Sequence, residues 1–127
     1  MAKTILVVDD SVTMVMSLRS TLTLNGFQVE SAGNGREALD KLAAGLKPDL
    51  IVTDVNMPVM TGVELYRHLR DSGHAIPTIL VTAYADDDVG SRALRDGVLG
   101  YLRKPVDEKH LKQCLLAALP RRGQPDD

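Results

Sequence analysis

The chain has 127 residues, of which 15 are basic and 17 acidic, so it lacks the excess of positive charge expected of a nucleic-acid-binding protein. Its hydrophobic fraction of 44% is ordinary for one globular domain, and no apolar run is long enough for a signal peptide or a membrane span. A single cysteine, Cys114, excludes an internal disulfide, and we expect a cytoplasmic protein that binds neither nucleic acid nor membrane.

Five short apolar runs alternate along the chain with longer stretches of helical periodicity. Most of these runs are rich in β-branched residues and nearly continuous in apolar character, which is typical of strands covered on both faces. The alternation predicts an α/β fold with a parallel sheet and right-handed crossovers. The expected strands are Thr4–Val8, Phe27–Glu30, Leu50–Thr53, Thr78–Val81 and Leu99–Arg103.

Short local signals mark the helix boundaries. We expect Asn25-Gly26 to end the first helix, Asn34 to cap the second, and Ser72-Gly73 to end the third. The fourth helix is expected after Asp86-Asp87-Asp88, and it contains Gly90 where a helix former would be expected. Either this glycine makes the helix marginal, as would suit a segment that moves, or it is merely tolerated.

The alternating pattern covers residues 1–119, which we interpret as one domain. Residues 120–127, with the sequence PRRGQPDD, show no apolar periodicity. We expect these residues to form a disordered tail.

Polar residues follow four of the five expected strands. Asp9 and Asp10 follow the first strand, Asp54 the third, Thr82 the fourth and Lys104 the fifth. The carboxyl ends of parallel strands lie on one edge of the sheet, where ligands bind in open α/β folds, so these side chains should converge. Crowded carboxylates suit Mg²⁺, and an Asp can accept a phosphoryl group whose charge an ammonium and a hydroxyl would stabilise.

Four stretches make the sequence similar to the receiver domain of two-component response regulators: ILVVDDS, DLIVTDVNMPVMTGVEL, PTILVTAYAD and GYLRKPVD. The resemblance extends from Lys3 to about Leu119. It implies a flavodoxin-like (βα)5 fold, a doubly wound parallel sheet with strand order 2-1-3-4-5. Two helices would cover one face of this sheet and three the other.

The resemblance also implies roles for the acidic residues. Asp54 resembles the phosphoacceptor and Asp10 a direct Mg²⁺ ligand, whereas Asp9 would act on the metal through water. Asn56 would contribute its backbone carbonyl to the metal.

Three further residues match the response machinery of the family. Thr82 resembles the switch hydroxyl that moves onto the phosphoryl group, and Lys104 the cation that pairs with the phosphorylated Asp. Tyr101 matches the aromatic residue whose rotamer reports the state of Thr82.

Gly62 falls where the family has a glycine at the start of the third helix, and we interpret it as structural.

The first helix carries apolar residues on more than one face. Met14, Leu18 and Leu22 recur at four-residue spacing and should face the core. A second set should lie opposite this face or on its flank, and we expect it to dock a histidine kinase or a histidine phosphotransfer protein. This set consists of Val12, Val15 and Met16.

These features predict a single-domain response regulator of the chemotaxis or phosphorelay type. Phosphorylation of Asp54 would alter the face made by the fourth helix, the fifth strand and the fifth helix, and an output protein would bind there. We expect a monomer, with dimerisation on activation left open. No enzymatic activity is expected beyond Mg²⁺-dependent self-phosphotransfer and autodephosphorylation.

Alternatives remain at this point. The chain could be the receiver portion of a longer DNA-binding transcription regulator, which the absence of a helix-turn-helix after Leu119 disfavours, or it could be a phosphate sink. A phosphatase of the haloacid-dehalogenase type is disfavoured because Ser11 stands where the second Asp of its D-x-D motif should be.

Overall fold

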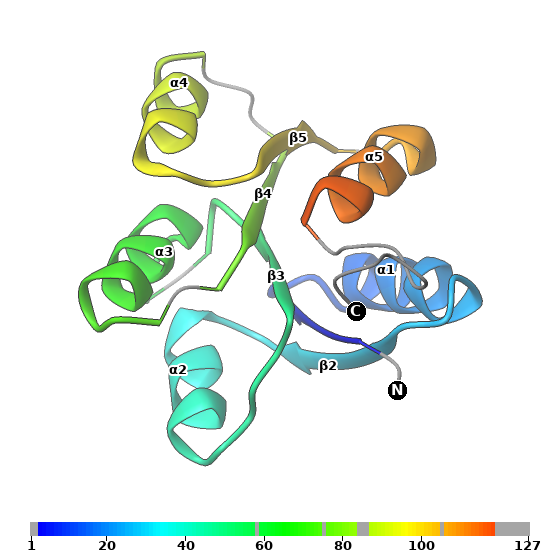
Figure 1. Cartoon of the computed structure of the whole chain (residues 1–127), viewed down its shortest axis with the longest axis horizontal. Coiled ribbons are helices and arrows are strands. Elements are labelled where there is room, and N and C mark those ends of the chain that lie inside the picture. The colour runs from blue at the N-terminus through cyan, green and yellow to red at the C-terminus, as the bar shows by residue number, and fades with distance from the viewer. Residues whose placement is uncertain (1–2, 58, 75, 84–86, 105, 119–127) are drawn as a thin grey trace, which may run out of the picture.

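The structure, a computed structural model, contains a five-stranded parallel sheet with the strand order β2-β1-β3-β4-β5, which confirms the predicted flavodoxin-like topology (Figure 1). It describes residues 3–57, 59–74, 76–83, 87–104 and 106–118, so the predicted disordered tail, 120–127, lies outside the described residues. The strands are β1 (Thr4–Val8), β2 (Gln28–Ala32), β3 (Leu50–Asp54), β4 (Thr78–Thr82) and β5 (Gly100–Arg103).

The helices cover the two faces of the sheet unequally. One face carries α1 (Val12–Leu24) and α5 (Glu108–Ala118), and the other carries α2 (Gly35–Ala43), α3 (Gly62–Asp71) and α4 (Asp87–Asp96) (Figure 1). One cluster of buried aliphatic side chains joins the sheet to α1 and α5, and two further clusters lie on the opposite face. Among the described residues, no helix is long and apolar enough to span a bilayer.

The strands differ from the predicted runs at β2 and at several ends. Backbone pairing with β1, rather than apolar character, sets the extent of β2, which is therefore shifted from the predicted Phe27–Glu30. As an edge strand it alternates exposed and half-buried residues. Strands β3 and β4 each extend one residue further than predicted, so Asp54 and Thr82 are their last residues, and β5 begins one residue later.

The helix boundaries follow the local signals closely. The Asn34 side chain caps α2 by accepting a hydrogen bond from the Glu37 backbone N–H at 2.8 Å. Asn25 caps the end of α1, and Ser72 caps the end of α3. Helix α4 begins at Asp87, so it includes the last two residues of the acidic run that was expected to precede it.

Gly62 is the point where α3 approaches the end of β3. A Cβ atom at this position would collide with the carbonyl oxygen of Asp54 and lie 3.2 Å from Cγ2 of Thr53. The Gly62 backbone N–H also donates to the carbonyl oxygen of Val55 at 3.0 Å, which holds the start of the helix against the strand end. Only glycine fits this approach, because the colliding atom belongs to the backbone.

We expect Gly62→Ala to destabilise the fold by about 2 kcal/mol or more, since the added methyl forces a backbone shift at the end of β3. Urea unfolding measures this change. Gly33→Ala is the matched control, because a Cβ there would meet only the flexible end of the Glu37 side chain at 3.3 Å. Equal midpoints for the two variants would contradict the close approach at Gly62.

Candidate functional site

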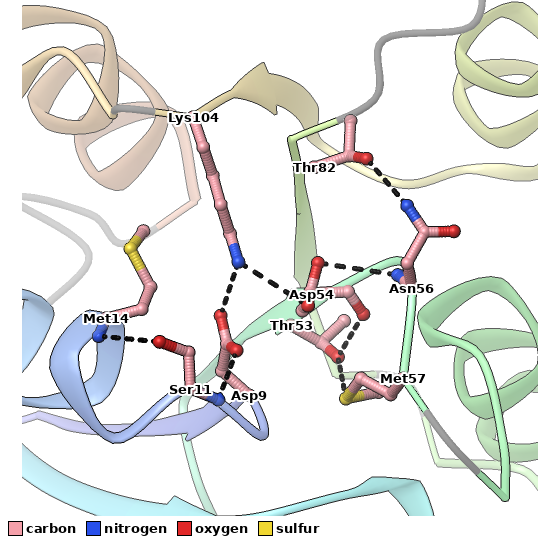
Figure 2. Close-up of polar contacts among 9 residues, drawn as sticks. All are labelled: Asp9, Ser11, Met14, Thr53, Asp54, Asn56, Met57, Thr82 and Lys104. Atoms are coloured by element: carbon pink, nitrogen blue, oxygen red, sulfur yellow. Dashed lines mark hydrogen bonds and ion pairs between the residues drawn. The ribbon is translucent and has the colours of Figure 1, made fainter.

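The polar residues at the strand ends converge at the carboxyl edge of the sheet. Oxygen atoms of Asp9, Asp10 and Asp54 lie within 4.8 Å of one another, although the residues belong to two different strand ends. Asp9 and Asp54 are buried, whereas Asp10 is exposed. Lys104 and Thr82 flank this cluster from β5 and β4 (Figure 2). The structure thus brings together the residues that the strand endings singled out.

Lys104 joins the two buried carboxylates. Its Nζ lies 3.0 Å from Oδ2 of Asp9 and 3.4 Å from Oδ2 of Asp54 (Figure 2). The Lys104 backbone N–H donates to the carbonyl oxygen of Thr82 at 2.8 Å, which fixes the point where the side chain leaves β5. Burial alone would lower the pKa of Lys104, but the hydrogen bond and charge of Asp9 and the charge of Asp54 outweigh it and raise this pKa.

Asp54 is held in an environment that disfavours its charge. Burial and the nearby charge of Asp9 raise its pKa above the ordinary value. Lys104 and the backbone N–H of Asn56, which donates to Asp54 Oδ1 at 3.4 Å, act in the opposite direction without cancelling this rise. A cation placed among these carboxylates would stabilise the ionised form of Asp54.

The donor set fits Mg²⁺, which takes oxygen ligands and is usually held by one or two carboxylates. Both Asp9 oxygens already accept hydrogen bonds, one from Lys104 and one from the Ser11 backbone N–H at 2.9 Å. Asp9 is therefore better suited to an indirect role than Asp10, whose carboxylate is exposed. Asn56 lies in the loop directly after β3, where its backbone carbonyl is close to Asp54 in the chain.

The Asn56 side chain makes a contact that sequence reasoning missed. Its Nδ2 donates to Oγ1 of Thr82 at 3.1 Å and links the loop after β3 to the end of β4 (Figure 2). Ser11 was also overlooked as part of the site. Besides its N–H bond to Asp9, its side chain caps α1 by accepting from the Met14 backbone N–H at 3.3 Å.

Tyr101 lies on β5, opposite Leu80 of β4. Its half-buried ring packs against the apolar cluster that joins α4 to the sheet. Side chains alternate along a strand, so Leu80 and Thr82 face the same side of the sheet, and Tyr101 shares this side. The structure therefore places both predicted switch residues on the side of the sheet that α2, α3 and α4 cover, at diagonal positions on neighbouring strands.

The predicted docking residues of α1 separate into two groups. Val12 and Met16 are exposed, with 72% and 64% of their surface accessible. Val15 is partly buried and packs against the core together with Met14. Of the three predicted docking residues, Val12 and Met16 are thus the exposed ones, and Leu24 at the far end of α1 is exposed as well. Leu18 and Leu22 are buried as the periodicity predicted.

Comparisons with known proteins agree with this arrangement. The family model for the response regulator receiver domain matches residues 5–116. "Response regulator MprA" of Mycolicibacterium vanbaalenii is 44% identical over 125 residues, which cover 97% of this chain and 52% of that protein. The protein of the same name from Mycobacterium tuberculosis is 42% identical over 129 residues, covering 100% of this chain and 54% of that protein. The chain spans about half the length of these curated relatives.

Solved structures show the same fold. The chemotaxis protein CheY4 of Vibrio cholerae superposes with a TM-score of 0.83 at 34% identity, covering 94% of this chain and 100% of that one. A response regulator receiver protein from Pseudomonas putida superposes with a TM-score of 0.85 at 28% identity, covering 92% and 98%.

We expect Asp54→Asn to raise the thermal midpoint of the metal-free protein by a few degrees Celsius at pH 7. The folded-state pKa of Asp54 lies above its unfolded value of 3.8, so ionisation destabilises the fold once the pH exceeds both values. Well below pH 3.8 the carboxyl is protonated in both states and this penalty is absent. Thermal scans in EDTA from acid to neutral pH measure the difference, and a gain that does not shrink toward acid pH would contradict this origin.

We expect Asp10→Asn to weaken Mg²⁺ binding by about tenfold or more, since it removes a ligand charge from the cluster. The thermal midpoint as a function of Mg²⁺ concentration measures the affinity. Asp40→Asn is the matched control, because Asp40 is an exposed carboxylate on α2 that pairs with Arg36. Identical Mg²⁺ dependence in both variants would contradict the placement of the metal.

Proposed function

The chain belongs to the response regulator receiver family of two-component signalling, and on this premise we propose that Asp54 accepts a phosphoryl group from a histidine kinase or a histidine phosphotransfer protein. The observation that carries the proposal is the position of the Asp54 carboxylate. It is buried at the end of β3, 3.4 Å from the Lys104 ammonium and within the cluster of three carboxylates.

In the proposed transfer, an Asp54 oxygen attacks phosphorus and a P–O bond forms as the P–N bond to the donor histidine breaks. The donor imidazole keeps the electron pair of the broken bond. Mg²⁺, held by Asp10, Asp54 and the Asn56 carbonyl with Asp9 acting through water, would neutralise charge on the phosphoryl oxygens. Lys104 supplies a positive charge beside Asp54, and the Thr82 hydroxyl supplies a hydrogen-bond donor.

The proposed consequence is a shift between two arrangements of the face formed by α4, β5 and α5. Thr82 leaves its contact with Asn56 to bind the phosphoryl group, and Tyr101 responds on the same side of the sheet. An output protein then binds this face, while Val12 and Met16 on α1 contact the phosphodonor. The protein acts as a switch in a chemotaxis or phosphorelay pathway, with no enzymatic turnover beyond its own phosphorylation and dephosphorylation. A monomeric state and a cytoplasmic location stay predictions from the sequence.

A second candidate follows from the length comparison. Because the chain spans about half of its curated relatives, the receiver can also be one part of a longer regulator whose activity it controls. The chemistry at Asp54 is the same for a receiver that acts alone and for a receiver within a longer regulator. Only the part that produces the output differs: it is a separate protein in the first case and another region of the same protein in the second.

We expect the protein to take up one phosphoryl group from acetyl phosphate in the presence of Mg²⁺ and none in EDTA. Asp54→Asn removes the acceptor and should abolish uptake, whereas Asp40→Asn leaves the site intact and should match the wild type. Intact-protein mass spectrometry detects the added group. Uptake by Asp54→Asn at the wild-type level would overturn the proposed function.

A further inference from the structure

Gly90 leaves a gap in the buried side of α4 that the ring of Tyr101 occupies. A Cβ atom at Gly90 would lie 2.9 Å from Cδ2, 3.0 Å from Cε2 and 3.3 Å from Cγ of Tyr101. Real side chains rarely tolerate such distances, so the ring lies directly against the helix at the position where a side chain would begin. We call this space the Gly90 gap.

The residue that carries this ring lies on the strand next to Thr82, at a diagonal position. Leu80 pairs with Tyr101 and Thr82 pairs with Arg103, so Tyr101 and Thr82 lie diagonally on one side of the sheet, and Leu80 and Tyr101 belong to the cluster that reaches α4. Any movement of Thr82 toward Asp54 therefore changes the space available beside the ring. Gly90 lies directly against the same ring, so a side chain at this position would limit where the ring can go.

Helix α4 is fixed to α3 at its other end. The Tyr66 hydroxyl donates to the carbonyl oxygen of Asp96 at 3.0 Å, and the Arg67 guanidinium pairs with the Asp96 carboxylate at 3.2 Å. A Cβ at the next residue, Gly97, would lie 2.6 Å from the Tyr66 hydroxyl, which shows how closely the two helices meet here. A methyl group added at Gly90 would therefore displace the ring, which turns about single bonds, more readily than the helix.

We propose that Gly90 is a positioning residue of the switch, because its missing side chain lets Tyr101 occupy the Gly90 gap in the arrangement in which Thr82 contacts Asn56. This inference rests on the proposed function and adds a regulatory determinant that is remote from Asp54. It gives the glycine a third interpretation, besides a weak helix and mere tolerance. Filling the gap raises the energy of this arrangement and favours the one adopted on phosphorylation.

The test is a double-mutant cycle on Gly90 and Tyr101, with Mg²⁺ and beryllofluoride as the probe of the phosphorylated arrangement. Affinity is measured by NMR titration for the wild type, Gly90→Ala, Tyr101→Ala and the double variant, and the ring resonances of Tyr101 are followed in parallel. Tyr101→Leu is a second ring-free background if Tyr101→Ala does not fold. Ser91→Ala is the matched control, because it also adds helix propensity but lies on the exposed side of α4.

We expect Gly90→Ala to tighten beryllofluoride binding by about fivefold or more and to shift the Tyr101 ring resonances. The same substitution should change the affinity by less than about twofold in the ring-free background, as should Ser91→Ala in the wild type. Equal effects of Gly90→Ala in both backgrounds, or weaker binding, would overturn the proposal.

Two further outcomes separate this inference from the proposed function. If the wild type binds no beryllofluoride, the proposed function fails and the switch role of Gly90 fails with it. If the wild type binds beryllofluoride and Gly90→Ala alters only the urea midpoint, the proposed function stands, and Gly90 is a packing residue without a role in the switch.

Discussion

The properties of the candidate site depend on the crowding of three carboxylates at the edge of a buried sheet. Asp9 and Asp54 cannot move apart, because each continues a strand, β1 or β3, whose residues are buried in the core. The Lys104 ammonium lies between them and offsets part of their repulsion, yet the pKa of Asp54 remains raised. The fold therefore stabilises a site that favours the binding of positive charge and the neutralisation of Asp54.

Much of this arrangement can be predicted from strand endings alone. Alternating apolar and helical segments indicate a parallel sheet, and a parallel sheet brings Asp9, Asp54, Thr82 and Lys104 to one edge. The order of the strands is not contained in that pattern and was predicted from the family resemblance. Strand β2 was placed wrongly because it is an edge strand, whose extent is set by pairing with β1 and not by burial.

The contacts that escaped prediction join residues far apart in the chain. The Asn56 amide reaches Thr82 because the loop after β3 turns toward β4, which no local pattern around Asn56 indicates. Two glycines show even more clearly that local patterns do not reveal contacts between distant residues. The family resemblance indicated a structural role for Gly62, and the sequence left the role of Gly90 open, but neither showed the atoms that require a glycine, which are the Asp54 backbone for Gly62 and the Tyr101 ring for Gly90. The role of each glycine is steric, and it becomes apparent only when the positions of the contacting residues are known.

The three apolar clusters differ in size, and this difference bears on the direction of the proposed response. Among the described residues, ten buried side chains form the cluster beneath α1 and α5, whereas only four form the cluster beneath α4. Elements with few buried contacts have the lowest cost of rearrangement. Tyr101 packs against this smaller cluster and Thr82 lies on the same side of the sheet, so the proposed change of charge at Asp54 would reach the smallest cluster of the core. The larger cluster keeps α1 in place, and with it the exposed pair Val12 and Met16. Under the proposed switch, the surface expected to meet the phosphodonor therefore need not change when Thr82 and Tyr101 rearrange.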